Sequence, residues 1–125
     1  MKKVLWSLGG ALALLAGCAT NDATSQLLGE RYILTNIDTY PVQIVSVDGV
    51  SSTLSPQRVR PGKRELLLRG PPGGAGFSEV VPFTVEVAPC TRVYIVAVKA
   101  NPLDTNFTPR IDHVMPLGSS CRAPA

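Results

Sequence analysis

The chain has 125 residues and is 45% hydrophobic, which is enough for one domain with a modest core and too little for two. Its formal net charge of +3 at pH 7 includes Lys2 and Lys3 at the very start, so the remainder is close to neutral. This balance does not suggest a nucleic-acid-binding protein.

A cationic start and an apolar run over residues 4–15 open the chain. A run of about a dozen residues suits a secretory signal and is too short to span a bilayer, which takes about 20 helical residues. The run ends in Leu15-Ala16-Gly17-Cys18, where an apolar residue and two small residues precede a cysteine. This segment closely resembles the lipobox of bacterial lipoproteins.

The lipobox resemblance implies that residues 1–17 are a signal peptide and that cleavage leaves Cys18 as the first residue. It further implies that the Cys18 thiol carries a diacylglycerol and that the new amino group is acylated. Each buried CH₂ contributes about 0.8 kcal/mol, so two or three acyl chains form a stable membrane anchor. The alternative is an ordinary secretory signal in which Cys18 is incidental.

The residue after Cys18 also bears on location, because an aspartate there resembles the inner-membrane retention signal of enterobacterial lipoproteins. This chain has Ala19 instead. We therefore expect an outer-membrane anchor with the domain facing the periplasm.

Residues 18–30 are small and polar through Gln26, and no apolar periodicity begins before Leu27. We expect this segment to be a flexible tether and residues 31–125 to form the folded domain.

From residue 31 onward, short apolar segments alternate with Pro, Gly, Asp and Asn, and no long stretch has helical spacing. Asp48-Gly49 predicts a tight turn, and Pro82 predicts an edge strand or a bulge. In residues 42–47, Val42 and Ile44 share one face and Val45 and Val47 the other. The class predicted is all-β, a small antiparallel β-sandwich, with strands at 32–34, 42–47, 64–69, 80–87, 93–98 and 108–115.

The segment at residues 93–98 is apolar on both faces, which predicts the centre of a sheet. Cys90 precedes it and Cys121 follows the last predicted strand, so antiparallel pairing would bring the two cysteines to one end. A secreted protein is in an oxidising compartment, and we expect one Cys90–Cys121 disulfide. A redox or metal role is the alternative, but the chain lacks CxxC and four clustered ligands, so we expect no metal and no cofactor.

Nothing in the sequence predicts catalysis. His113 and Asp112 are neighbours on a strand and should point to opposite faces, and Ser119 and Ser120 lack a nucleophile elbow. The glycine-rich residues 70–76 lack the lysine and hydroxyl of a phosphate loop, so we expect a mobile connection there. We do not expect an enzyme.

One local cluster of positive charge, Arg58, Arg60, Lys63 and Arg64, is a candidate partner-binding surface. The alternative is a solvated turn and strand edge. Residues 45–68 also resemble the PEGA class of extracytoplasmic β modules, with a VDG turn and then V-x-PG-x-x-x-L-x-L. That resemblance implies a sandwich-like module for surface attachment or spacing.

These features together predict a lipid-anchored accessory protein of the cell envelope that docks a protein partner through an exposed sheet edge or the basic turn. The alternative is a glycan- or lipopolysaccharide-binding module, which the small number of aromatic residues disfavours. An envelope hydrolase is a third hypothesis. The sequence does not determine the oligomeric state.

Overall fold

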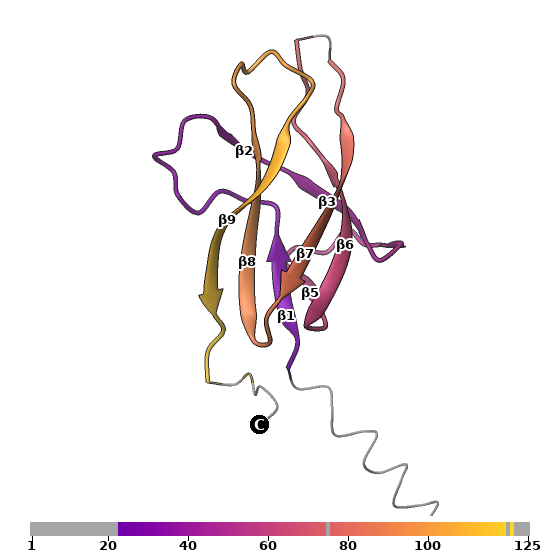
Figure 1. Ribbon diagram of the computed structural model, residues 1–125, viewed down its shortest axis with the longest axis vertical. Coiled ribbons are helices and arrows are strands. Elements are labelled where there is room, and N and C mark those ends of the chain that lie inside the picture. The colour runs from indigo at the N-terminus through magenta and orange to yellow at the C-terminus, as the bar shows by residue number, and fades with distance from the viewer. Residues whose placement is uncertain (1–22, 75, 120, 122–125) are drawn as a thin grey trace, which may run out of the picture.

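The computed structural model describes residues 23–74, 76–119 and 121 (Figure 1). The expected signal peptide, Cys18 and the first part of the expected tether lie outside this part of the chain. The described residues contain nine strands and no helix, and hence no helix able to cross a membrane. The strands are β1 (Ser25–Leu28), β2 (Thr39–Pro41), β3 (Gln43–Val47), β4 (Val50–Ser51), β5 (Gln57–Val59), β6 (Gly62–Arg69), β7 (Val80–Val87), β8 (Thr91–Val98) and β9 (Thr108–Pro116).

The strands form two sheets, which confirms the predicted all-β sandwich. In the first, called sheet A, β8 is the central strand and pairs with β9 along one edge. Along its other edge, β8 pairs with β1 over its first half and with β2 over its second half. Strand β5 pairs with the other edge of β1. The second, sheet B, has the order β4-β3-β6-β7. The predictions of β8 as a central strand and of β7, which contains Pro82, as an edge strand are both confirmed.

The core lies between the inner faces of the two sheets. In β6, Leu66 and Leu68 are buried while Leu67 is 41% exposed, because successive side chains of a strand point to opposite faces. Phe107 closes the core at the end where the β6–β7 and β8–β9 loops meet, and there it packs directly against Gly70. The buried core residues are Leu27, Val42, Val47, Val59, Leu66, Leu68, Val85, Val87, Val93, Ile95, Ala97 and Phe107.

The flexible tether predicted for residues 18–30 is wrong over its last part, because Ser25–Leu28 is strand β1. Leu27 is buried in the core, and the Ser25 hydroxyl donates to the Ala88 carbonyl at 2.6 Å and accepts from the Thr91 amide at 3.2 Å. Ser25 can therefore be buried although it is polar, because its hydroxyl is hydrogen-bonded to residues more than sixty positions away in the sequence. The folded domain includes β1 and does not start at residue 31.

The strand predicted at residues 32–34 is also wrong, because these residues lie in the β1–β2 loop. The strand predicted at residues 42–47 is confirmed as β3, but its faces differ from the prediction. The pairing of β3 with β6 shifts register between Ile44 and Ser46, which makes Val45 an extra residue. This bulge lets Val42, Ile44 and Val47 all pack on the core.

The Asp48-Gly49 turn is confirmed, since it joins β3 to β4 and both of its residues have positive φ (49° and 82°). Two positive φ values are what a two-residue hairpin turn of the primed kind requires.

The glycine-rich segment, residues 70–76, was expected to be a mobile connection. Its Gly73 and Gly74 lie against residues 103–105 of the β8–β9 loop, and the Gly74 amide donates to the Leu103 carbonyl.

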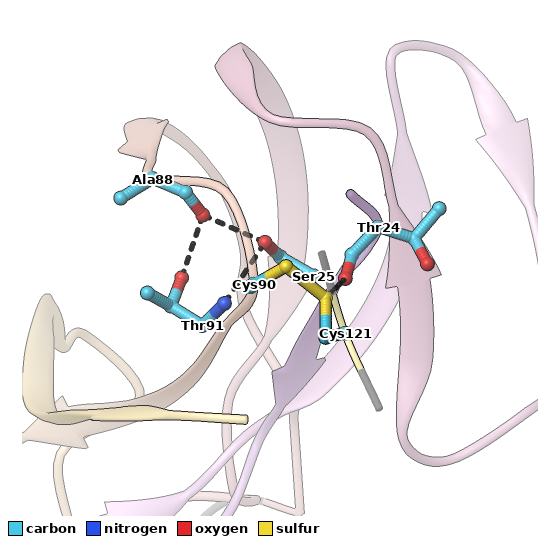
Figure 2. The surroundings of a disulfide bond; sticks show 6 residues. All are labelled: Thr24, Ser25, Ala88, Cys90, Thr91 and Cys121. Atoms are coloured by element: carbon cyan, nitrogen blue, oxygen red, sulfur yellow. Dashed lines mark hydrogen bonds between the residues drawn. A yellow bond between two sulfur atoms is a disulfide. The ribbon is translucent and has the colours of Figure 1, made fainter. Parts of the chain in front are cut away.

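The predicted disulfide is present, with Cys90 and Cys121 Cα atoms 5.7 Å apart (Figure 2). It joins the β7–β8 turn to the segment after β9, and the Thr24 carbonyl lies 3.5 Å from the Cys121 sulfur. The disulfide therefore lies at the end of the sandwich where β1 begins. The β6–β7 and β8–β9 loops are at the opposite end (Figure 1).

Candidate functional site

The predicted basic cluster spans β5, the β5–β6 turn and the start of β6. The Arg64 side chain holds this turn in place. Its guanidinium forms an ion pair with the Asp48 carboxylate at 2.8 Å. It also donates to the carbonyls of Arg60 and Pro61 at 2.9 and 3.0 Å. The Glu65 amide donates to Asp48 as well, and this bond, followed by the Arg64 contact, lowers the pKa of Asp48. Arg64 thus joins the β3–β4 hairpin to β6.

The structure brings three of the four predicted basic residues together. Arg58, Arg60 and Arg64 line a depression of about 200 Å³ beside the β3–β4 hairpin, and Asp48 and Gln57 line it too. Lys63 does not line the depression, and in the register of sheet B it lies opposite Glu86 on β7. The basic cluster is therefore partly assembled, with one of its charges already neutralised by Asp48.

A second surface, which sequence reasoning missed, is the outer face of sheet A. Its centre is a group of three rings, called here the ring cluster: Tyr32, Tyr94 and His113. The Tyr32 and His113 rings are stacked with centroids 4.0 Å apart and planes 7° apart, and Tyr32 lies 5.0 Å from Tyr94. Tyr32 comes from the β1–β2 loop, whereas the other two rings come from β8 and β9.

Asp112 fixes the β1–β2 loop on this face. The pairing of β8 with β9 shifts register so that Asp112 is an extra residue between Ile111 and His113. Its side chain is fully buried, and its Oδ2 accepts the backbone amides of Tyr32 and Ile33 at 2.7 and 2.9 Å. The prediction that Asp112 and His113 point to opposite faces is wrong, because the bulge directs both side chains to the β1–β2 loop: Asp112 binds the Tyr32 and Ile33 amides, and His113 stacks on the Tyr32 ring.

The far part of the β1–β2 loop presents three aliphatic residues to solvent, called here the loop tip: Ile33, Leu34 and Ile37. Leu34 is 70% and Ile37 88% exposed. The loop backbone is nevertheless ordered by internal bonds, because Arg31 donates to the carbonyls of Leu34 and Asn36 at 2.7 and 3.2 Å. In Figure 1 the loop projects sideways from the sandwich between β1 and β2.

The open sheet edges, the other docking surface considered from sequence, are poorly suited to pairing with another strand. Edge strand β7 contains Pro82, and edge strand β9 contains Pro109 and the Asp112 bulge. The other three edge strands, β2, β4 and β5, have only three, two and three residues. Proline, bulges and short length all disfavour strand addition. Side chains therefore offer the better docking surface.

The described residues contain no group of three His, Cys, Asp or Glu side chains that could hold a metal ion. No protein-family model, curated protein or solved structure matches the chain. The lipobox and PEGA assignments therefore stay resemblances.

Proposed function

We propose that this protein is a lipid-anchored accessory protein of the bacterial envelope, facing the periplasm, that binds a protein partner through its loop tip. The observation that carries the proposal is that Leu34 and Ile37 are exposed on a loop whose backbone is held in place. Clustered exposed aliphatic side chains are typical of interaction sites.

The fixed conformation of the β1–β2 loop favours tight binding of a partner. A loop that is already held in one conformation loses little conformational entropy when a partner binds. Asp112 and Arg31 supply that order by hydrogen bonds to the loop backbone. The loop tip can thus act as an aliphatic anchor that enters a pocket on the partner.

The position of β1 limits how far the domain can move from the membrane. If Cys18 carries the lipid, only residues 19–24 separate it from β1. Six residues span at most about 20 Å when fully extended. The end of the sandwich with the Cys90–Cys121 disulfide would therefore lie next to the bilayer.

The docking test is affinity purification from detergent-solubilised envelopes, with mass spectrometry of the proteins recovered. We expect a partner at constant ratio with the wild type, and its loss in the double variant Leu34→Asp/Ile37→Asp. The matched control is Leu103→Asp, which changes a leucine that is 69% exposed in the β8–β9 loop, outside the loop tip, and should retain the partner. Equal recovery of the partner by the loop-tip variant would refute this docking site.

The basic cluster of Arg58, Arg60, Lys63 and Arg64 is the competing docking surface. Arg64 is unsuitable for testing it, because its substitution would also release the Asp48 contact. Arg58→Gln together with Lys63→Gln removes positive charge without breaking that ion pair. Loss of the partner in this variant, with retention in the loop-tip variant, would move the site to the basic turn.

The anchor is tested separately with Cys18→Ala. We expect this variant to be released from the membrane or to stall before signal cleavage. Normal processing together with unchanged partitioning into the detergent phase would contradict lipidation of Cys18.

A further inference from the structure

The outer face of sheet A combines the ring cluster with three arginines. Residues that are paired across neighbouring strands share a face, so the register places Arg58, Gln26, Arg92 and Met115 in one row. Tyr94 and His113 form the next row, and Arg110, paired with Val96, lies in the row beyond. Rows two residues apart are separated by about 7 Å. The rings therefore lie between arginines on both sides.

The ring cluster is a firm platform. Tyr32 is stacked on His113 and contacts Tyr94, while its backbone amide is bound by the buried Asp112 carboxylate. Tyr32 is nevertheless 45% exposed. A fixed aromatic ring with an open surface can stack on the C–H face of a sugar ring, which needs an apolar contact with a defined plane.

The arginines give this platform a positive charge. Arg92 donates through Nε to the Gln26 side-chain oxygen at 2.9 Å, which orients its guanidinium. The Arg110 side chain is 46% exposed, and its Nη2 lies 3.8 Å from the buried Asp112 Oδ1, which accepts no hydrogen bond. Arg110 therefore forms a long ion pair with Asp112 and still presents its guanidinium to solvent. Arg58 is exposed at the other end of the row. An excess of positive charge therefore surrounds the rings.

We propose that this face binds an acidic glycan, with a sugar ring stacked on Tyr32 and carboxylates of neighbouring sugars paired with Arg92 and Arg110. Arginine suits this role because its planar guanidinium matches a carboxylate with two parallel hydrogen bonds. The sequence-based objection to a glycan site was the scarcity of aromatic residues. The fold removes this objection, because it brings two tyrosines and the histidine together on one face. This site shares the β1–β2 loop with the loop tip but uses other side chains, so Leu34→Asp/Ile37→Asp and Tyr32→Ala test the two sites separately.

The test is calorimetric titration of the detergent-solubilised full-length protein with trigalacturonate and with neutral maltotriose. We expect trigalacturonate to bind at least ten times more tightly. Tyr32→Ala should weaken it at least tenfold, while Tyr32→Phe, which keeps the ring, should stay within about threefold of wild type. Arg92→Gln should reduce the preference for the acidic sugar and leave maltotriose binding unchanged.

The matched control is Phe77→Ala, which removes an aromatic ring that is 69% exposed in the β6–β7 loop. It should bind trigalacturonate like the wild type, and equal weakening by Phe77→Ala and Tyr32→Ala would overturn the site. Absence of binding, or equal affinity for both trisaccharides, would overturn the proposal. So would triglutamate binding as tightly as trigalacturonate and surviving Tyr32→Ala, because the face would then recognise acidic peptides by charge alone.

Discussion

Asp112 offers the sharpest test of how the β1–β2 loop is held. Replacing it with alanine removes two hydrogen bonds from a charged acceptor, at 2.7 and 2.9 Å, each of which contributes about 1.5–3 kcal/mol. Part of this loss is offset because the buried carboxylate no longer has to be desolvated. We therefore expect Asp112→Ala to lower the free energy of unfolding by about 2–3 kcal/mol. Asp112→Asn keeps an acceptor oxygen of the same shape without the charge and should cost about 1 kcal/mol.

Urea unfolding measures these stabilities, and amide hydrogen exchange locates the effect. In a domain of this size each kcal/mol corresponds to about 4–8 °C in melting temperature, so the alanine variant should melt about 10 °C or more below the wild type. The amides of Tyr32 and Ile33 should exchange faster in the order wild type, Asn, Ala. The control is Asp104→Ala in the exposed β8–β9 loop, which should be close to neutral. Unchanged protection of Tyr32 and Ile33 in Asp112→Ala would refute the role assigned to this carboxylate.

Three further predictions concern the rest of the fold. Replacing Cys90 and Cys121 with serine opens a crosslink between residues 31 positions apart and should cost about 3.7 kcal/mol, as measured by urea unfolding; a loss below about 1 kcal/mol would contradict the chain-entropy estimate. Gly29→Ala would drive its Cβ into the backbone oxygen of Val42, which lies between β2 and β3, and should destabilise by more than about 2 kcal/mol, whereas Gly118→Ala, with open space around it, should stay within about 0.5 kcal/mol by thermal unfolding. Because the folded-state pKa of Asp48 is lowered, its contribution to stability is complete above its ordinary value of 3.8 and is lost as pH falls through the folded-state value. Asp48→Asn should therefore show a smaller loss of stability below pH 4 than the wild type in urea midpoints measured against pH, and parallel curves would contradict this.

The sequence predicted best where alternation and turn chemistry act locally. The predicted strand at residues 80–87 matches β7, because its apolar positions follow a period of two from Phe83 onward. Residues 93–98 lie within β8, and their apolar character on both faces suits its central position. The Asp48-Gly49 hairpin was predictable because aspartate and glycine adopt the positive φ angles that this turn requires. In each case the information lies within a few neighbouring residues.

The errors came from features that exist only once distant segments meet. Strand β1 forms through parallel pairing with β8, and nothing in its own four residues marks it as a strand. Bulges at Val45 and Asp112 depend on the register of a partner strand, so local alternation assigns the wrong faces.

The ring cluster was missed for the same reason, because it forms only when distant segments meet. Tyr32 and His113 are far apart in the sequence and meet because Asp112 binds the loop that carries Tyr32. Asn36 and Asp38 beside Ile37 were the available hint that residues 32–37 form a loop, since both types favour turns.

The direct succession of β1 and the loop tip determines how tension would pass through the molecule. The covalent path between a lipid on Cys18 and a partner at Leu34 would run through β1, because no other strand lies between those two points in the chain, and Asp112 of β9 would share the load through its bonds to Tyr32 and Ile33. Strand β1 is flanked by β5 and β8, whose hydrogen bonds would be sheared together along its axis and would not be opened one at a time. Sheet B and the disulfide would stay off this path, so the domain could transmit force between membrane and partner while most of its core remains unstrained.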